Sequence, residues 1–161
     1  MNPELLIRIL ADYTLIIIAL LGAFALLFRV PNRQRLQAYS RIVMAGLTAL
    51  LIAKLVAAIW QPSEVRPFIE KGVEAGAAYL NNPGFPSDHA LFAAAIVLAV
   101  YFETPMKKLA LVLGGLTLLM ALGRVLALVH TPLDIVGGLL FAAVGALWYA
   151  SDPTRGSKSA R

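Results

Sequence analysis

Long apolar runs constrain this chain more than any other feature of its sequence. Residues 13–28 contain no charged side chain, and four further apolar runs with few charges follow before residue 150. A helix needs about 20 mostly apolar residues to cross the hydrocarbon core of a bilayer. Only helices and closed barrels satisfy their backbone hydrogen bonds in lipid. We therefore predict an all-α integral membrane bundle of about five transmembrane helices, at residues 5–28, 42–61, 87–102, 106–129 and 132–150.

The amino-acid composition excludes several classes of protein. Of the 161 residues, 60% are hydrophobic and 14% are charged, against about 45–50% and 25% in ordinary soluble domains. A soluble enzyme and a disordered chain are thereby excluded. So is a nucleic-acid-binding domain, because the charges behind the net +5 are few and scattered. The absence of cysteine excludes disulfides and thiol catalysis. The length predicts one domain over residues 1–161.

The distribution of positive charge predicts how the bundle is oriented. Nine of the 14 Lys and Arg residues lie at residues 29–41, at residues 107–108 and in a polar tail at residues 151–161. The positive-inside rule assigns this side to the cytoplasm and the N-terminus to the outside. Of the other five cations, Lys54 and Arg124 lie within apolar helices. A charge costs at least about 2.5–3.5 kcal/mol there, so these two residues indicate a functional site.

Three segments with chemically active side chains meet on the outer side in this topology. They are residues 54–68, 85–89 and 123–134. In the second segment, Pro86 stops an incoming helix and Ser87 suits an N-cap, so the following N–H groups form a potential anion site. In the third, Thr131 suits an N-cap. Asp134 either completes this cap or accepts a hydrogen bond from His130.

The residue types in these segments suit phosphoryl transfer without a metal. One imidazole can attack phosphorus and a second can protonate the leaving oxygen, while Lys54, Arg66 and Arg124 would neutralise the phosphoryl oxygens. A zinc site on the two histidines with Asp88 and Asp134 is an alternative, although the cations would repel a divalent ion. A second alternative is a non-catalytic membrane protein, either a small transporter or a lipid-binding subunit, in which Lys54 and Arg124 would bind an anion. Inverted repeats would favour a transporter, and the sequence shows none.

These segments resemble the three-part signature of the type 2 phosphatidic acid phosphatase superfamily, K-x6-R-P, P-S-G-H and S-R-x5-H-x3-D. The resemblance covers residues 54–134, about half of the chain. Three positions depart from the pattern. Lys54 is separated from Arg66 by 11 residues instead of six, and the glycine and first serine of the signature are Asp88 and Gly123 here. Many members of this superfamily have six spans.

The resemblance implies a role for each matched residue. His130 would be the nucleophile that forms a phosphohistidine, Asp134 would orient it, and His89 would be the general acid. No metal or cofactor is implied. Asp88 would be an accessory residue or simply a helix-start carboxylate. The residues implied to bind the phosphoryl group are Lys54, Arg66, Ser87 and Arg124.

Within this superfamily the chain is most similar to bacterial undecaprenyl-diphosphate phosphatases, which recycle the lipid carrier of cell-wall synthesis. The resemblance implies hydrolysis of undecaprenyl diphosphate to undecaprenyl phosphate in the bacterial inner (plasma) membrane. The site would face the periplasmic or extracellular side. A phosphatidylglycerophosphate or phosphatidic acid phosphatase is the alternative within the superfamily. The expected partners are a lipid phosphate and the bilayer, and no nucleic acid.

Residues 69–82 separate the first two active segments and contain both charged and small residues. Two interpretations are open for this stretch. It is either a plain connector or a short amphipathic helix at the outer interface, where it would act as a lid or as the edge by which a lipid enters.

Overall fold

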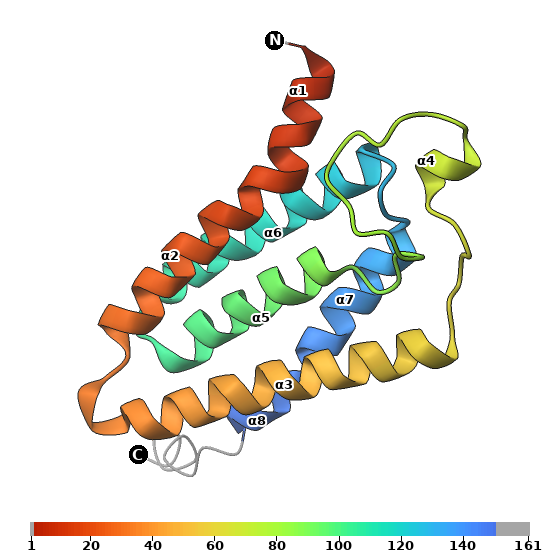
Figure 1. Ribbon diagram of the computed structural model, residues 1–161. Coiled ribbons are helices and arrows are strands. Elements are labelled where there is room, and N and C mark those ends of the chain that lie inside the picture. Colours follow the sequence, from red (N-terminus) through yellow and green to blue (C-terminus); the bar gives the residue numbers. More distant parts are fainter. Residues whose placement is uncertain (1, 151–161) are drawn as a thin grey trace.

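The structure is a computed structural model that describes residues 2–150, so the predicted polar tail lies outside the described residues. Over this range all of its regular secondary structure is helical, as predicted. Figure 1 shows the helices in chain order. They are α1 (Pro3–Arg8), the π-helix η1 (Ile9–Tyr13), α2 (Thr14–Arg29), the 3-10 helix η2 (Asn32–Gln34), α3 (Arg35–Ile59), α4 (Pro67–Glu70), α5 (Asp88–Glu103), α6 (Lys107–Leu126), α7 (Pro132–Gly145) and α8 (Leu147–Ala150).

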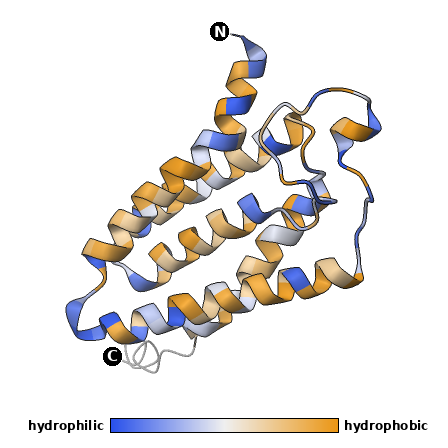
Figure 2. Ribbon diagram, in the orientation of Figure 1, coloured by the Kyte–Doolittle hydropathy of each residue, from blue (hydrophilic) through white to orange (hydrophobic). Residues whose placement is uncertain are grey.

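Four of the helical stretches are long and apolar enough to cross a membrane: Pro3–Arg29, Asn32–Ile59, Lys107–Leu126 and Pro132–Ala150. Large apolar side chains such as Leu20, Leu51, Leu118 and Leu140 are exposed on their outer faces, and Figure 2 shows apolar residues along the long helices. These outer faces suit contact with lipid. The predicted membrane bundle is thereby confirmed. The expected third span is the helix α5, which has 16 residues and is shorter than the other four.

The helix α5 is the centre of the bundle. It contacts α2, α3, α6 and α7, and Figure 1 shows it with α2 and α6 on one side and α3 and α7 on the other. Ala90, Ala93 and Ala99 on α5 are 0–2% exposed. Small residues at these positions allow neighbouring helices to approach closely, as is typical of membrane bundles. The first turn of α5 is therefore held firmly from several directions.

Two glycines bring the first turns of α5 and α7 together. A Cβ atom on Gly137 would lie 2.5 Å from Cε2 of Phe85, and one on Gly138 would lie 2.5 Å from the carbonyl oxygen of Ser87. In this close contact the N–H of Ser87 donates to the carbonyl oxygen of Asp134 at 2.9 Å. The second and third active segments are thus fixed side by side by backbone contact.

The opposite end of α5 is held by an ion pair. Glu103 is buried, and its two carboxylate oxygens accept from Nε and Nη2 of Arg41 at 2.8 and 2.7 Å. The sequence placed Arg41 among the cytoplasmic cations. The pair links α3 to α5, so the central helix is tied to its neighbours at both ends.

The amphipathic helix considered for residues 69–82 is wrong, because the chain beyond Glu70 forms an irregular loop. The helix α4 ends at Glu70, and Gly72 follows with a φ of 65°, a left-handed conformation that glycine adopts easily. Two N–H groups of the loop bond elsewhere in the fold. Gly76 donates to the carbonyl of Ala127, and Ala78 donates to the carboxylate of Asp12. These tertiary hydrogen bonds replace the helical ones.

Candidate active site

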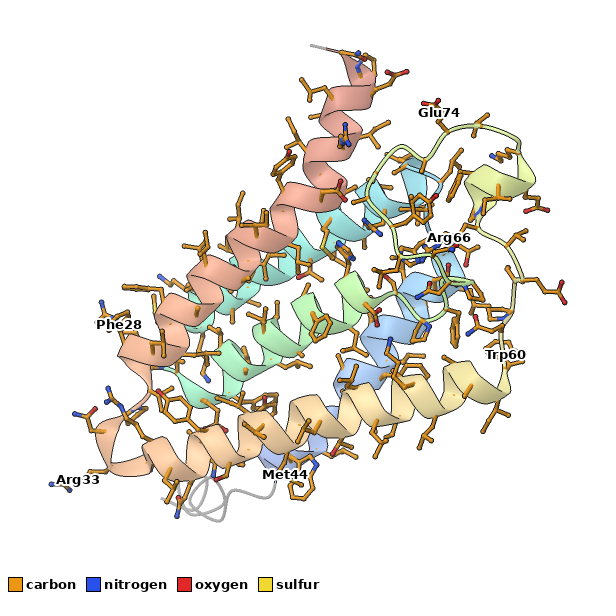
Figure 3. All side chains as sticks on the ribbon, in the orientation of Figure 1. Phe28, Arg33, Met44, Trp60, Arg66 and Glu74 are labelled. Atoms are coloured by element: carbon orange, nitrogen blue, oxygen red, sulfur yellow. The ribbon has the colours of Figure 1, made fainter. Side chains whose placement is uncertain are left out.

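A cavity of about 310 Å³ lies where the loop between α4 and α5 crosses the first turn of α5 and the end of α6. His89, His130, Arg66 and Arg124 all line it. Figure 3 shows Arg66 among the side chains crowded beside this loop. The structure therefore brings residues from all three active segments to one cavity, which is lined also by Asp88.

His130 and Asp134 form a hydrogen-bonded pair across the N-cap of α7, with His130 before the helix and Asp134 in its first turn. The Nδ1 atom of His130 lies 3.4 Å from Oδ2 of Asp134, and both side chains are about 95% buried. A carboxylate partner favours the tautomer with the proton on Nδ1. The lone pair on Nε2 is then free to act as a nucleophile.

The same carboxylate completes the helix cap. Oδ2 of Asp134 accepts from the N–H of Thr131 at 2.8 Å, and Oγ1 of Thr131 accepts from the N–H of Asp134 at 3.2 Å. This reciprocal arrangement is a capping box. Both sequence interpretations of Asp134 therefore hold together, since the cap fixes the carboxylate that contacts His130.

Burial lowers the pKa of His130 below its ordinary value. The hydrogen bond to Asp134 opposes this shift, while the positive charges of Arg124 and Arg66 add to it. Desolvation has this effect because it disfavours the charged form of a histidine. The imidazole of His130 is consequently neutral at neutral pH, as a nucleophile must be.

His89 is positioned by the start of α5. The side chain of Ser87 accepts from the N–H of Ala90 at 3.4 Å, which confirms the predicted N-cap. Next to His89, Asp88 accepts from Nζ of Lys54 at 2.9 Å. The Lys54 side chain is 54% exposed and lies outside the residues that line the cavity. Lys54 on α3 thus contacts Asp88 at the cavity's edge, and the non-helical stretch at residues 60–66 carries the chain from the end of α3 to Arg66.

Arg66 is buried and makes four hydrogen bonds with the backbone and side chains around it. Its acceptors are the carbonyl oxygens of Val129, Leu80 and Asn82 and the Oδ1 atom of Asn82. Burial lowers the pKa of Arg66, against the opposing charges of Asp134, Tyr79 and Asp88. Arg66 therefore supports the loop over the cavity as well as placing positive charge at its wall.

Arg124 is the most deeply buried charged residue of the cavity, at 1% exposed. Its Nη1 atom donates to Oδ1 of Asp12 at 2.9 Å and to the carbonyl of Ala78 at 2.8 Å. Its Nε atom has no hydrogen-bond partner among the described residues. A buried donor that lacks an acceptor costs about 1–3 kcal/mol, and more when it is charged. Arg124 is therefore well suited to bind an anion.

Sequence reasoning missed two partners of the arginines, Asp12 and Asn82. Asp12 gave a signal, because it is the only acidic residue in the apolar run at residues 5–28, and an ionisable residue within a span is a functional candidate by default. Asn82 gave no signal, because an asparagine in a polar loop is ordinary.

A metal centre needs several donor side chains gathered around one point. Among residues 2–150 no group of three or more His, Cys, Asp or Glu side chains is placed to hold a metal ion. The zinc alternative therefore has no ligand set in this part of the chain, and Arg66 and Arg124 line the same cavity as the two histidines.

Comparison with known proteins agrees with this geometry. The model of the PAP2 superfamily matches residues 37–156. Undecaprenyl-diphosphatase BcrC of Bacillus subtilis (strain 168) is 28% identical over 135 residues, which cover 84% of this chain and 67% of that protein. No solved structure matches this chain. The family match includes every site residue predicted from the sequence, from Lys54 to Asp134, and it begins after Asp12.

Proposed function

This chain belongs to the PAP2 superfamily of lipid phosphatases, and we propose that it hydrolyses a membrane lipid diphosphate through a phosphohistidine intermediate. The observation that carries the proposal is the buried pair of His130 and Asp134, beside a cavity shared with His89 and two buried arginines. Membership of a phosphatase family also leaves the transporter alternative without support.

The proposed reaction has two steps at one phosphorus atom. Nε2 of His130 attacks the terminal phosphorus, the bond to the leaving oxygen breaks, and His89 donates a proton to that oxygen. His89 then accepts a proton from a water molecule that attacks the phosphohistidine, which releases phosphate and restores His130. Positive charge stabilises the negative charge that develops on the phosphoryl oxygens. We assign this binding to Arg66, Arg124, Lys54 and the N-cap at Ser87, with Asp88 as an accessory residue that holds Lys54.

Two observations support a diphosphate substrate and an outward-facing site. The relative that covers 84% of this chain is named an undecaprenyl-diphosphatase, so we propose undecaprenyl diphosphate as the substrate. In Figure 1 the site lies at the opposite end of the bundle from the α2–α3 and α5–α6 connections, where Arg33 and Lys107 are found. By the positive-inside rule, this arrangement supports a site that faces the periplasmic or extracellular side of a bacterial plasma membrane.

The substrate proposal is tested with the purified protein in detergent. We expect phosphate release from undecaprenyl diphosphate in the presence of EDTA, and slower release from phosphatidylglycerophosphate and phosphatidic acid. Faster hydrolysis of either of these two lipids would replace the diphosphate assignment. Activity that EDTA removes and a divalent metal restores would contradict the metal-free mechanism.

The pH dependence of the reaction follows from the lowered pKa of His130. The neutral imidazole is the reactive form, and a lowered pKa keeps it neutral to lower pH. We expect kcat/KM to fall on the acid side with a midpoint below about 6.5, the ordinary pKa of histidine. A pH profile on undecaprenyl diphosphate measures this midpoint. A midpoint above the ordinary histidine value would contradict the assignment of His130 as the nucleophile.

A further inference from the structure

We propose that Asp12, on the N-terminal helix, is a positioning residue for Arg124 and for the loop that crosses the cavity. The inference rests on the proposed function, because it gives Arg124 the task of binding the phosphoryl group. Asp12 lies outside residues 37–156, which the family model matches, so membership of the superfamily assigns no role to it.

Asp12 closes a ring of three hydrogen bonds. Its Oδ1 atom accepts from Nη1 of Arg124 at 2.9 Å, and its Oδ2 atom accepts from the N–H of Ala78 at 3.1 Å. Nη1 of Arg124 also donates to the carbonyl oxygen of Ala78 at 2.8 Å. The ring joins three parts of the chain that are far apart in sequence, namely η1, the end of α6 and the loop over the cavity.

Local helix geometry places Asp12 in this ring. Asp12 belongs to η1, the π-helical turn that interrupts the run from α1 to α2. Such turns are rare and are frequently found at functional sites. Ala11, the residue before Asp12, is fully buried against the rest of the fold. The side chain of Asp12 itself is 19% exposed and lies 2.9 Å from Nη1 of Arg124, behind the residues that line the cavity.

Gly123 permits this approach. A Cβ atom at this position would lie 2.8 Å from the backbone nitrogen of Ala11 and 2.9 Å from the carbonyl carbon of Leu10. The superfamily signature that this chain resembles has a serine here, and a serine side chain would collide with η1. The departure at Gly123 and the position of Asp12 therefore have the same structural cause, which is the close contact of η1 with α6.

The ring has a direct consequence for phosphate binding. The carboxylate of Asp12 compensates the charge of a guanidinium that is 1% exposed. It engages Nη1 and leaves Nε without a partner among the described residues. If Asp12 is removed, the guanidinium of Arg124 and the N–H of Ala78 both lose the carboxylate that accepts their hydrogen bonds. A displacement of about 1 Å in a group that contacts the reacting atoms costs about 10²-fold in rate.

The test is a double-mutant cycle on the full-length protein. We expect Asp12→Ala to lower kcat/KM about 10²-fold, but to change it only within about twofold when Arg124→Ala is already present. Asp12→Asn keeps an acceptor for Ala78 and should lose less activity than Asp12→Ala. Glu4→Gln is the matched control, because it removes one carboxylate from the same N-terminal helix and should leave activity unchanged. The inference would be overturned if Asp12→Ala lowered kcat/KM equally in the wild-type protein and in the Arg124→Ala variant, or if it caused no loss in the wild-type protein.

A second readout keeps the inference separate from the choice of substrate. Binding of inorganic phosphate is measured by the rise it causes in the melting temperature. We expect Asp12→Ala to reduce this rise, and Glu4→Gln to preserve it. A variant that melts earlier yet retains the full rise and full activity would show a purely structural role and contradict the inference. If the wild-type protein binds phosphate but hydrolyses none of the three lipids, the proposed function fails, while the effect of Asp12→Ala on phosphate binding still decides this inference.

Discussion

Replacement of His130 by alanine is expected to abolish phosphate release, with a loss of at least about 10³-fold in kcat. The variant lacks the nitrogen that we propose attacks phosphorus, and the other histidine that lines this cavity, His89, lies on α5. Release of phosphate from the lipid diphosphate measures the loss. The wild-type protein should also yield a phosphoprotein that is labile in acid and stable in base, and the variant should yield none.

His89 offers the matched comparison for this result. With a substrate whose leaving group needs no proton, such as p-nitrophenyl phosphate, His89→Gln should still form the phosphohistidine and then hydrolyse it slowly. The phosphoprotein should therefore accumulate in His89→Gln and be absent in His130→Ala. Full activity in His130→Ala would eliminate the nucleophile assignment, and a phosphoprotein in that variant would place the intermediate on another residue.

The second large effect is expected for Asp134→Asn. An asparagine still offers an oxygen to the N–H of Thr131, so the helix cap should survive, with a stability change below about 1 kcal/mol. It no longer enforces the tautomer of His130 that leaves Nε2 free. In serine proteases the same substitution of the aspartate that orients the catalytic histidine lowers kcat about 10⁴-fold, and we expect a loss of at least about 10²-fold here. The loss in kcat is checked by measuring activity, and the survival of the helix cap is checked by measuring the melting temperature of the same variant.

Thr131→Ala is the reciprocal control for Asp134→Asn. It removes the hydroxyl that accepts from the N–H of Asp134 and should cost about 1 kcal/mol of stability, while the contact between Asp134 and His130 remains. We expect this variant to melt earlier and to retain most of its activity. The opposite pattern, an active Asp134→Asn and an inactive Thr131→Ala, would show that Asp134 serves the cap alone.

Features that depend on neighbouring residues could be predicted from the sequence. Ser87 and Thr131 cap α5 and α7 as their positions before a helix indicate. Asp134 follows His130 by four residues across the predicted cap at Thr131, and the structure shows the two side chains in contact. The apolar runs predict the helices for the same reason, since each run carries its own length and hydropathy.

Features that depend on tertiary contact could not be predicted in this way. Nothing in the sequence around Arg66 indicates that Asn82 and three backbone carbonyls surround it. The pairing of Lys54 with Asp88 and of Arg124 with Asp12 likewise joins residues that are far apart in the chain. The loop after α4 could not be recognised as irregular, because hydrogen bonds to distant groups determine its path.

The way in which the two buried arginines hold this loop affects how its sequence can change. Arg66 and Arg124 hold the loop mainly by donating hydrogen bonds to backbone carbonyl oxygens, which are those of Ala78, Leu80 and Asn82. Every residue type supplies a carbonyl oxygen, so the side chains of Ala78 and Leu80 can be exchanged without removing these hydrogen bonds, whereas Asn82 also accepts through its side-chain Oδ1. We therefore expect substitutions at Ala78 and Leu80 to change this wall of the cavity while Arg66 and Arg124 stay in place beneath it.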